Sequence, residues 1–135
     1  MKTKQILFLV FLLAVTYSLS GCNIIRGFIG ADRLYFCEKY DQVNDFCEGK
    51  GEKFGVGSLA VLADLKKPIG VEEVYINVKD NATGQNVHNF PFTVKPDMDY
   101  INFKGVTFTS AGSYKVSLIK KDGSLVASND LEIVN

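Results

Sequence analysis

The sequence predicts an all-β protein in which residues 57–135 form an antiparallel β-sandwich of about seven strands. From residue 57 onward, apolar and polar side chains alternate over short segments, as in strands with one buried face. Clusters of Gly, Pro, Asn and Asp interrupt these segments at a spacing of roughly 8–12 residues, which is typical of sandwiches. No segment of this part keeps a helical period over the length of an ordinary helix.

Composition narrows the possible functions. The chain has 135 residues, with 15 basic and 15 acidic side chains and a formal net charge of zero. A balanced charge gives no broad electrostatic footprint for nucleic acid, so no nucleic-acid partner is expected. An apolar share of 47% is too high for a disordered chain, and the length suits one modest domain.

Residues 1–21 have the pattern of a cleaved secretory signal. Lys2 and Lys4 precede the apolar run Ile6–Val15, and small residues follow it. As a helix this run would extend about 15 Å, about half of a bilayer core, so it is too short for a transmembrane span. The alternative is a buried helix of the mature fold, but the order of charged, apolar and small residues favours export.

The four residues Leu19-Ser20-Gly21-Cys22 resemble the lipobox of bacterial lipoproteins. This resemblance implies cleavage before Cys22 and a thioether-linked diacylglycerol, with palmitate as a typical acyl chain, that anchors the protein in the bacterial cell envelope. In enteric-type bacteria an Asp after the Cys favours the inner membrane, so Asn23 implies outer-membrane sorting. Loss of Lys2 and Lys4 leaves 13 basic and 15 acidic groups, a net charge of −2.

Cys37 and Cys47 are expected to form a disulfide. Export would bring them into an oxidising compartment, where paired thiols normally join. Closing so short a loop restricts the unfolded chain by roughly 2.5–3 kcal/mol in the entropic treatment. Redox pairs usually have two intervening residues, and a zinc site needs more ligands than His88, the single imidazole, supplies. Free or intermolecular thiols are the remaining alternative.

The lipidated segment 22–56 is expected to precede the sandwich. Residues 23–36 are too apolar for a free tether. They either rest on the lipid interface or pack against the domain, and the sequence leaves both interpretations open. Residues 48–57 contain four Gly and are expected to form a loop.

The strands of the sandwich are expected in the following order: Ser58–Lys66, Glu72–Lys79, Gln85–Lys95, Tyr100–Phe103, Val106–Thr109, Ser113–Lys120, Ser124–Ser128 and Leu131–Val134. Pro91 favours an edge strand or a bend, because proline cannot donate to a ladder. Asp122-Gly123 predicts a hairpin turn. Asn129-Asp130 is interpreted as a bulge or kink.

Residues 107–116 resemble the corner before the penultimate strand of immunoglobulin-like domains, with Gly112 at the turn and Tyr114 pointing inward. The resemblance implies that the Tyr114 ring fills one end of the core and that its hydroxyl bonds a backbone group of the preceding loop. Val116 would stand where antibody domains have a Cys. The chain has no Trp and no Cys pair between the sheets, which excludes antibody-type domains.

Catalytic chemistry is not expected. The chain has no Gly-x-Ser-x-Gly elbow, no phosphate loop and no nucleophile–base pair, so we expect no enzyme, no cofactor and no metal. His88 is interpreted as a surface residue. Asp97 and Asp99 would bind Ca²⁺ weakly at best, and turn chemistry explains them better.

The expected function is therefore a non-catalytic binding module, held at the membrane by its lipid anchor and contacting another envelope or extracellular protein. Most aromatic residues are expected in the core, but Tyr75 and Tyr100, if outward, would offer a binding face. The alternatives are a structural accessory lipoprotein of an envelope complex, or a small inhibitor of an envelope or host protease or lysozyme.

The lipid anchor leads to a direct test. Replacing Cys22 with Ser removes the only sulfur that the lipobox offers, so incorporation of radiolabelled palmitate should fall to background. Cys47→Ser, which keeps the lipobox intact, is the control and should remain labelled. Undiminished labelling of Cys22→Ser would show that the lipobox interpretation is wrong.

Overall fold

The structure, a computed structural model, describes residues 32–135 and forms ten β-strands and no helix within them, which confirms the predicted all-β class. The strands are β1 (Arg33–Cys37), β2 (Lys39–Asp41), β3 (Phe46–Glu48), β4 (Lys53–Gly55), β5 (Gly57–Asp64), β6 (Glu73–Asp80), β7 (Asn86–Thr93), β8 (Tyr100–Phe108), β9 (Gly112–Lys120) and β10 (Leu125–Val134). The predicted signal, the lipobox with Cys22, and Asn23 lie outside the described residues.

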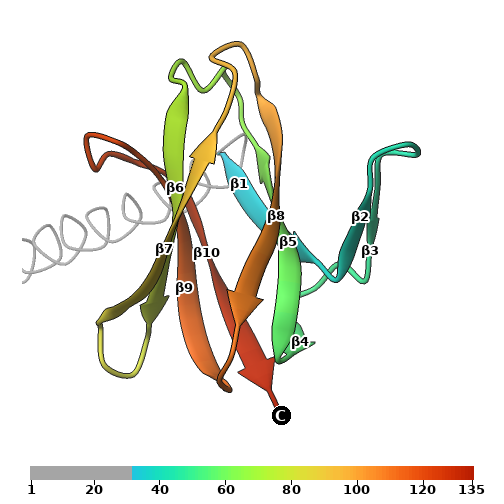
Figure 1. The fold of residues 1–135 in the computed structure, drawn as a ribbon, viewed down its shortest axis with the longest axis vertical. Helices are drawn as coiled ribbons and strands as arrows, with labels where there is room; N and C mark the ends of the chain where they lie inside the picture. The colour runs from blue at the N-terminus through green and yellow to red at the C-terminus, as the bar shows by residue number, and fades with distance from the viewer. Residues whose placement is uncertain (1–31) are drawn as a thin grey trace, which may run out of the picture. The chain divides into compact units, whose positions relative to one another are not determined.

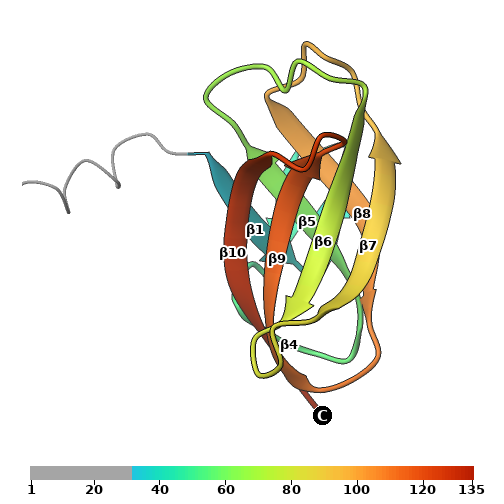
Figure 2. The same ribbon diagram turned by 90° about the vertical axis from the view of Figure 1, so that its left-hand side faces the viewer.

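Two sheets face each other, and a small hairpin stands beside them (Figures 1 and 2). One sheet has the order β1-β5-β8, the other has the order β4-β10-β9-β6-β7, and β2 pairs with β3. All pairings are antiparallel except the parallel contact of β4 with β10. Side chains from both sheets share one hydrophobic cluster, so the core lies between two layers, as in a sandwich.

Alternation along the strands produces this core. Val74, Ile76 and Val78 on β6 are fully buried, as the period-two pattern predicts, while the residues between them are only partly covered or exposed. On β9 the buried set is Tyr114, Val116 and Leu118, again the residues that the pattern places inward.

The sheets begin at residue 33 rather than at residue 57. β1 pairs with β5, and Leu34 and Phe36 of β1 belong to the core. Phe54 of β4 is buried beside the end of β10. Of the two interpretations left open for residues 23–36, packing against the domain is therefore confirmed for residues 33–36. Asp32 is exposed, and residues 23–31 lie outside the described residues.

Local irregularities explain where the expected strands differ from the observed ones. Gly105, at φ +75°, lies in a register shift that joins the two short strands expected around it into the single strand β8. Pro91 lies on β7, which is an edge strand, as predicted. A second shift, between Val78 and Lys79 on β6, leaves Val87 without a regular partner, and its side chain is 41% exposed.

The connection between β9 and β10 follows the predicted turn, with Gly123 at φ +87°. The expected bulge at Asn129-Asp130 is wrong, because Asn129 pairs with Val116 and Asp130 with Lys115 in regular register. The shift occurs earlier, between Leu125 and Ala127. The Asn129 side chain instead links the two sheets, because its Nδ2 donates a hydrogen bond to the Leu34 carbonyl of β1 at 3.0 Å.

Tyr114 is buried near the start of β9, and its hydroxyl reaches back to the loop that precedes the strand. The Tyr114 hydroxyl donates to the Ser110 carbonyl of the preceding loop at 2.8 Å. The ring lies 5.4 Å from that of Phe108, measured between centroids. A Cβ at position 112 would lie 3.4 Å from the Tyr114 ring, an ordinary van der Waals contact, so the ring lies close over Gly112.

Substitutions at Tyr114 separate the ring from its hydroxyl. Tyr114→Ala should lower the free energy of unfolding by roughly 3–5 kcal/mol, because it removes a large buried aromatic side chain. Tyr114→Phe keeps the ring and should cost only about 0.5–1.5 kcal/mol, the usual net value of one hydrogen bond. Urea unfolding followed by circular dichroism measures both. An Ala variant as stable as the wild type would contradict this role for the corner.

Candidate binding surface: the disulfide-stapled hairpin

The hairpin of β2 and β3 projects sideways from the three-stranded sheet, as Figure 1 shows. It follows β1 directly, and its strands pair Lys39 with Glu48 and Asp41 with Phe46. Gly49, at φ +64°, ends the hairpin, and a Cβ there would lie 2.8 Å from the Glu38 side chain. The positive φ and the nearby Glu38 side chain therefore favour glycine at this position.

The predicted disulfide between Cys37 and Cys47 is confirmed, and it fixes the base of the hairpin. Cys37 is the last residue of β1 and is fully buried, whereas Cys47 is the middle residue of β3. Their Cα atoms are 5.5 Å apart, inside the usual range for a disulfide. The bond therefore ties the hairpin to the edge of the core.

The hairpin covers the outer face of the three-stranded sheet. Ala60 and Leu62 on β5 point away from the main core, yet they are buried in a second cluster with Cys37. Tyr40 from β2 and Cys47 from β3 pack against this cluster. Since β5 carries apolar side chains on both faces, both faces must be covered, and the hairpin supplies the second cover.

A pair of tyrosines extends this second cluster. The hydroxyls of Tyr35 on β1 and Tyr100 on β8 lie 2.7 Å apart and share a hydrogen bond. Burial, followed by this hydrogen bond, raises the pKa of Tyr35 above its ordinary value. The Lys50 ammonium lies 4.2 Å from the centre of the Tyr35 ring, within the range of a cation–π contact.

Asn102 lies on the same outer face as Tyr100, two residues further along β8, and is paired in register with Leu62. Its amide oxygen and nitrogen are both buried. Neither has a hydrogen-bond partner within residues 32–135. A buried amide without a partner costs about 1–3 kcal/mol, so this layer is not arranged for maximal stability.

Side-chain hydrogen bonds hold the tip of the hairpin. The Asp41 carboxylate accepts from the backbone N–H of Val43 at 2.9 Å and from the Asn44 side chain at 2.7 Å. The Asn44 hydrogen bond is the main reason that the pKa of Asp41 is lowered. Asp45 adopts φ +50° and accepts from the Tyr40 hydroxyl, which raises the pKa of Tyr40 to about 12. The turn is thus ordered by its own polar groups.

Two apolar side chains remain exposed on this ordered hairpin. Val43 at the tip is 92% exposed and Phe46 at the start of β3 is 60% exposed. Residues 38–48 also carry four acidic side chains and one basic side chain, a net charge of −3. A rigid support with exposed apolar groups and an acidic rim has the features of a protein-binding element.

No model of a known protein family matches the chain, and no curated protein is significantly similar to it. Function is therefore inferred from the geometry of the described residues.

The structure does not bring the two proposed binding tyrosines together. Tyr75 lies on β6 in the five-stranded sheet, and its hydroxyl donates to the Glu73 carboxylate at 2.6 Å. Tyr100 lies on β8 in the other sheet, and its hydroxyl shares a hydrogen bond with that of Tyr35. Both point away from the shared core, but from different sheets, so they do not form a common face.

The remaining candidates take ordinary surface positions. His88 is exposed on β7, 5.4 Å from the Phe90 ring. Asp97 and Asp99 lie in the loop before β8, where the Asp99 carbonyl accepts from the backbone N–H of Leu65 at 2.7 Å. Over residues 32–135 no three His, Cys, Asp or Glu side chains gather closely enough to hold a metal ion. In the same range no helix has the length and apolar character to cross a membrane.

The exposed tip was not identified from the sequence. Residues 38–46 are mostly polar and lack strand alternation, so their hairpin was not expected. The available signal was Val43 and Phe46, two apolar residues inside a polar loop that a disulfide closes. Such residues have no core to enter, because the loop is too short to fold back over them.

Reduction of the disulfide should loosen the hairpin without dissolving the sandwich. The expected loss of stability is about 2.5–3 kcal/mol, the loop-closure value. Limited proteolysis with mass mapping should then show rapid cleavage within residues 38–48 and slow cleavage within 57–135. Equal resistance of the hairpin before and after reduction would contradict the role assigned to the disulfide.

Proposed function

We propose that this protein is a lipid-anchored, non-catalytic binding module of the bacterial cell envelope, and that the disulfide-stapled hairpin contacts a partner protein. The anchor follows from the lipobox resemblance at Cys22, and Asn23 favours the outer membrane by the same resemblance. The immunoglobulin-like class belongs to this proposal too, supported by the Tyr114 hydrogen bond.

The observation that carries the proposal is the exposure of Val43 and Phe46 on an ordered support. A flexible loop would lose conformational entropy on binding. This hairpin has lost much of that entropy already through the disulfide and the Asp41 turn. Apolar and aromatic side chains presented in this way are typical of the few residues that dominate the energy of an interface.

Charge indicates the kind of partner. The net charge of −3 over residues 38–48 complements a basic rim around an apolar pocket. Beside the hairpin, β2 and the facing edge of β5 and β8 border a groove of ≈ 290 Å³ lined by Tyr40, Leu59 and Lys104. A partner segment that passes the hairpin tip could continue into this groove.

The inhibitor function is the second candidate, and the projection of the hairpin from the sheet favours it (Figure 1). A narrow, rigid element with an apolar end suits the cleft of a protease or a lysozyme. A structural accessory role would require no such projecting element. Assays of a panel of serine proteases and lysozymes with the purified protein would separate inhibition from simple attachment.

The hairpin proposal is tested by replacing its exposed apolar side chains in the full chain. The double variant Val43→Ser/Phe46→Ser should weaken partner capture about tenfold or more, because residues at the centre of an interface often contribute over 1 kcal/mol each. Chemical cross-linking in intact cells, followed by affinity purification from detergent, measures the capture.

Val87→Ser is the matched control, since Val87 is an exposed apolar residue on a different strand. It should leave capture unchanged. Equal capture by the wild type, the double variant and the control would contradict a role for the hairpin. Circular dichroism confirms that all three proteins are folded.

A further inference from the structure

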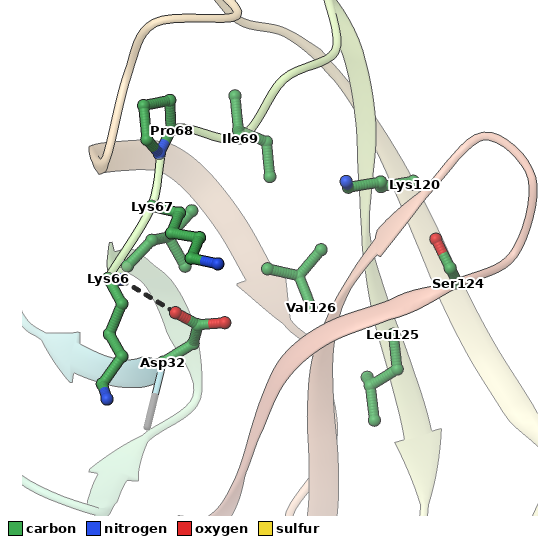
Figure 3. A pocket seen from close by; sticks show the side chains of 10 residues that line it. Asp32, Lys66, Lys67, Pro68, Ile69, Lys120, Ser124, Leu125 and Val126 are labelled. Atoms are coloured by element: carbon green, nitrogen blue, oxygen red, sulfur yellow. Dashed lines mark hydrogen bonds between the residues drawn. The ribbon is translucent and has the colours of Figure 1, made fainter. Parts of the chain in front are cut away.

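A hollow of ≈ 400 Å³ opens at one end of the sandwich, between the segment that follows β5 and the turn that joins β9 to β10 (Figure 3). Ile69 and Leu65, both buried, form part of its wall together with Val126 of β10. The register shift between Leu125 and Ala127 lies at this wall. The hollow therefore has apolar side chains on part of its wall.

Lysines surround this apolar lining. Lys66, Lys67 and Lys120 line the hollow with a single acidic residue, Asp32, which leaves an excess of two positive charges. In Figure 3 the amino groups of Lys67 and Lys120 point from opposite sides toward the space beside Val126, while that of Lys66 points away. Asp32 Oδ1 accepts from the Lys66 backbone N–H at 2.9 Å, so one of its oxygens is already engaged.

The two inward lysines have no acidic partner among the described residues. The ion pairs found there join Lys53 to Glu132 at 3.9 Å and Lys121 to Glu73 at 3.4 Å, and neither includes Lys67 or Lys120. Two unpaired ammonium groups that converge on one space favour a ligand with concentrated negative charge. The apolar wall favours a ligand whose anionic group carries an uncharged extension.

We infer that this hollow binds the phosphate group of an anionic phospholipid headgroup. The inference rests on the lipid anchor of the proposed function. Nine residues lie between Cys22 and Asp32, which lines the hollow. The ten chain steps that join these two residues span at most about 35 Å, so an anchored Cys22 holds Asp32 within that distance of the membrane.

The surroundings of the hollow also favour a lipid over a free phosphate ester. Leu125, which is 63% exposed, lines the hollow beside the lysines. Apolar side chains flanked by lysines are typical of surfaces that rest on anionic membranes. Headgroups held near the hollow by the anchor would bind at high effective concentration, so weak intrinsic affinity would suffice.

The test uses the acylated full chain in vesicles of phosphatidylcholine, with or without phosphatidylglycerol. The protein is treated with a water-soluble acetylating reagent, and the acetylation rate of each lysine is measured by mass spectrometry. Lys67 and Lys120 should react several-fold more slowly when phosphatidylglycerol is present. Lys79 and Lys115, exposed lysines on β6 and β9, should react at the same rate in both vesicles.

Paired variants provide a second readout. Hydrogen exchange in the peptide 120–126 should slow in phosphatidylglycerol vesicles for the wild type and for the control Lys79→Ser/Lys115→Ser. Lys67→Ser/Lys120→Ser, which removes the same charge, should lose this slowing. A further sample in pure phosphatidylcholine receives glycerol 3-phosphate in solution.

The outcomes separate the site from the anchor. Equal lysine rates in both vesicles, or equal slowing of all four lysines, would overturn the site. Protection by dissolved glycerol 3-phosphate but not by phosphatidylglycerol would overturn the lipid as the source of the phosphate. A protein that fails to float with any vesicle would refute the anchor, and the dissolved phosphate ester would then decide whether the hollow binds phosphate.

Discussion

The need to cover both faces of β5 governs the arrangement of this protein. Val61 and Ala63 enter the main core, while Ala60 and Leu62 face the other way and are also buried. A three-stranded sheet with two apolar faces is unstable in water unless something lies on its outer side. The hairpin after β1 fills that position, and the disulfide keeps it there. The same bond that completes the fold therefore also presents Val43 and Phe46 to solvent.

The sequence predicts the regular part of the fold well, because alternation and turn residues are local signals. β6 and β9 bury the residues expected of them, and the Asp122-Gly123 turn and the edge position of Pro91 are as predicted. β1 and β4 could not be assigned to the sheets in the same way. Leu34 and Phe36 are buried because β1 pairs with β5, a strand more than twenty residues later in the chain. A three-residue strand such as β4 is too short to show a period-two pattern. The bulges at Val87 and Gly105 likewise depend on the partner strand.

The candidate site was harder to predict than the fold. The disulfide followed from the number and expected compartment of the cysteines, but its consequence for the shape of residues 38–48 did not. The Tyr75 and Tyr100 interpretation was based on outward position alone, and outward residues of different sheets need not meet. The hollow near Asp32 combines residues from three distant segments, so no local pattern in the chain could indicate it. Its lysines would be interpreted as solvated when each is considered alone.

One further consequence arises from the irregular edge strands. β7 contains a proline without an N–H and a bulge at Val87, and β8 is broken in register at Gly105. An intact, flat border would offer a ladder of free donors and acceptors to a second copy. Proteins anchored to a membrane, as proposed here, encounter other copies of themselves far more often than proteins in dilute solution. The irregular hydrogen bonding along β7 and β8 therefore makes these two edges poor templates for pairing with a second copy of the chain.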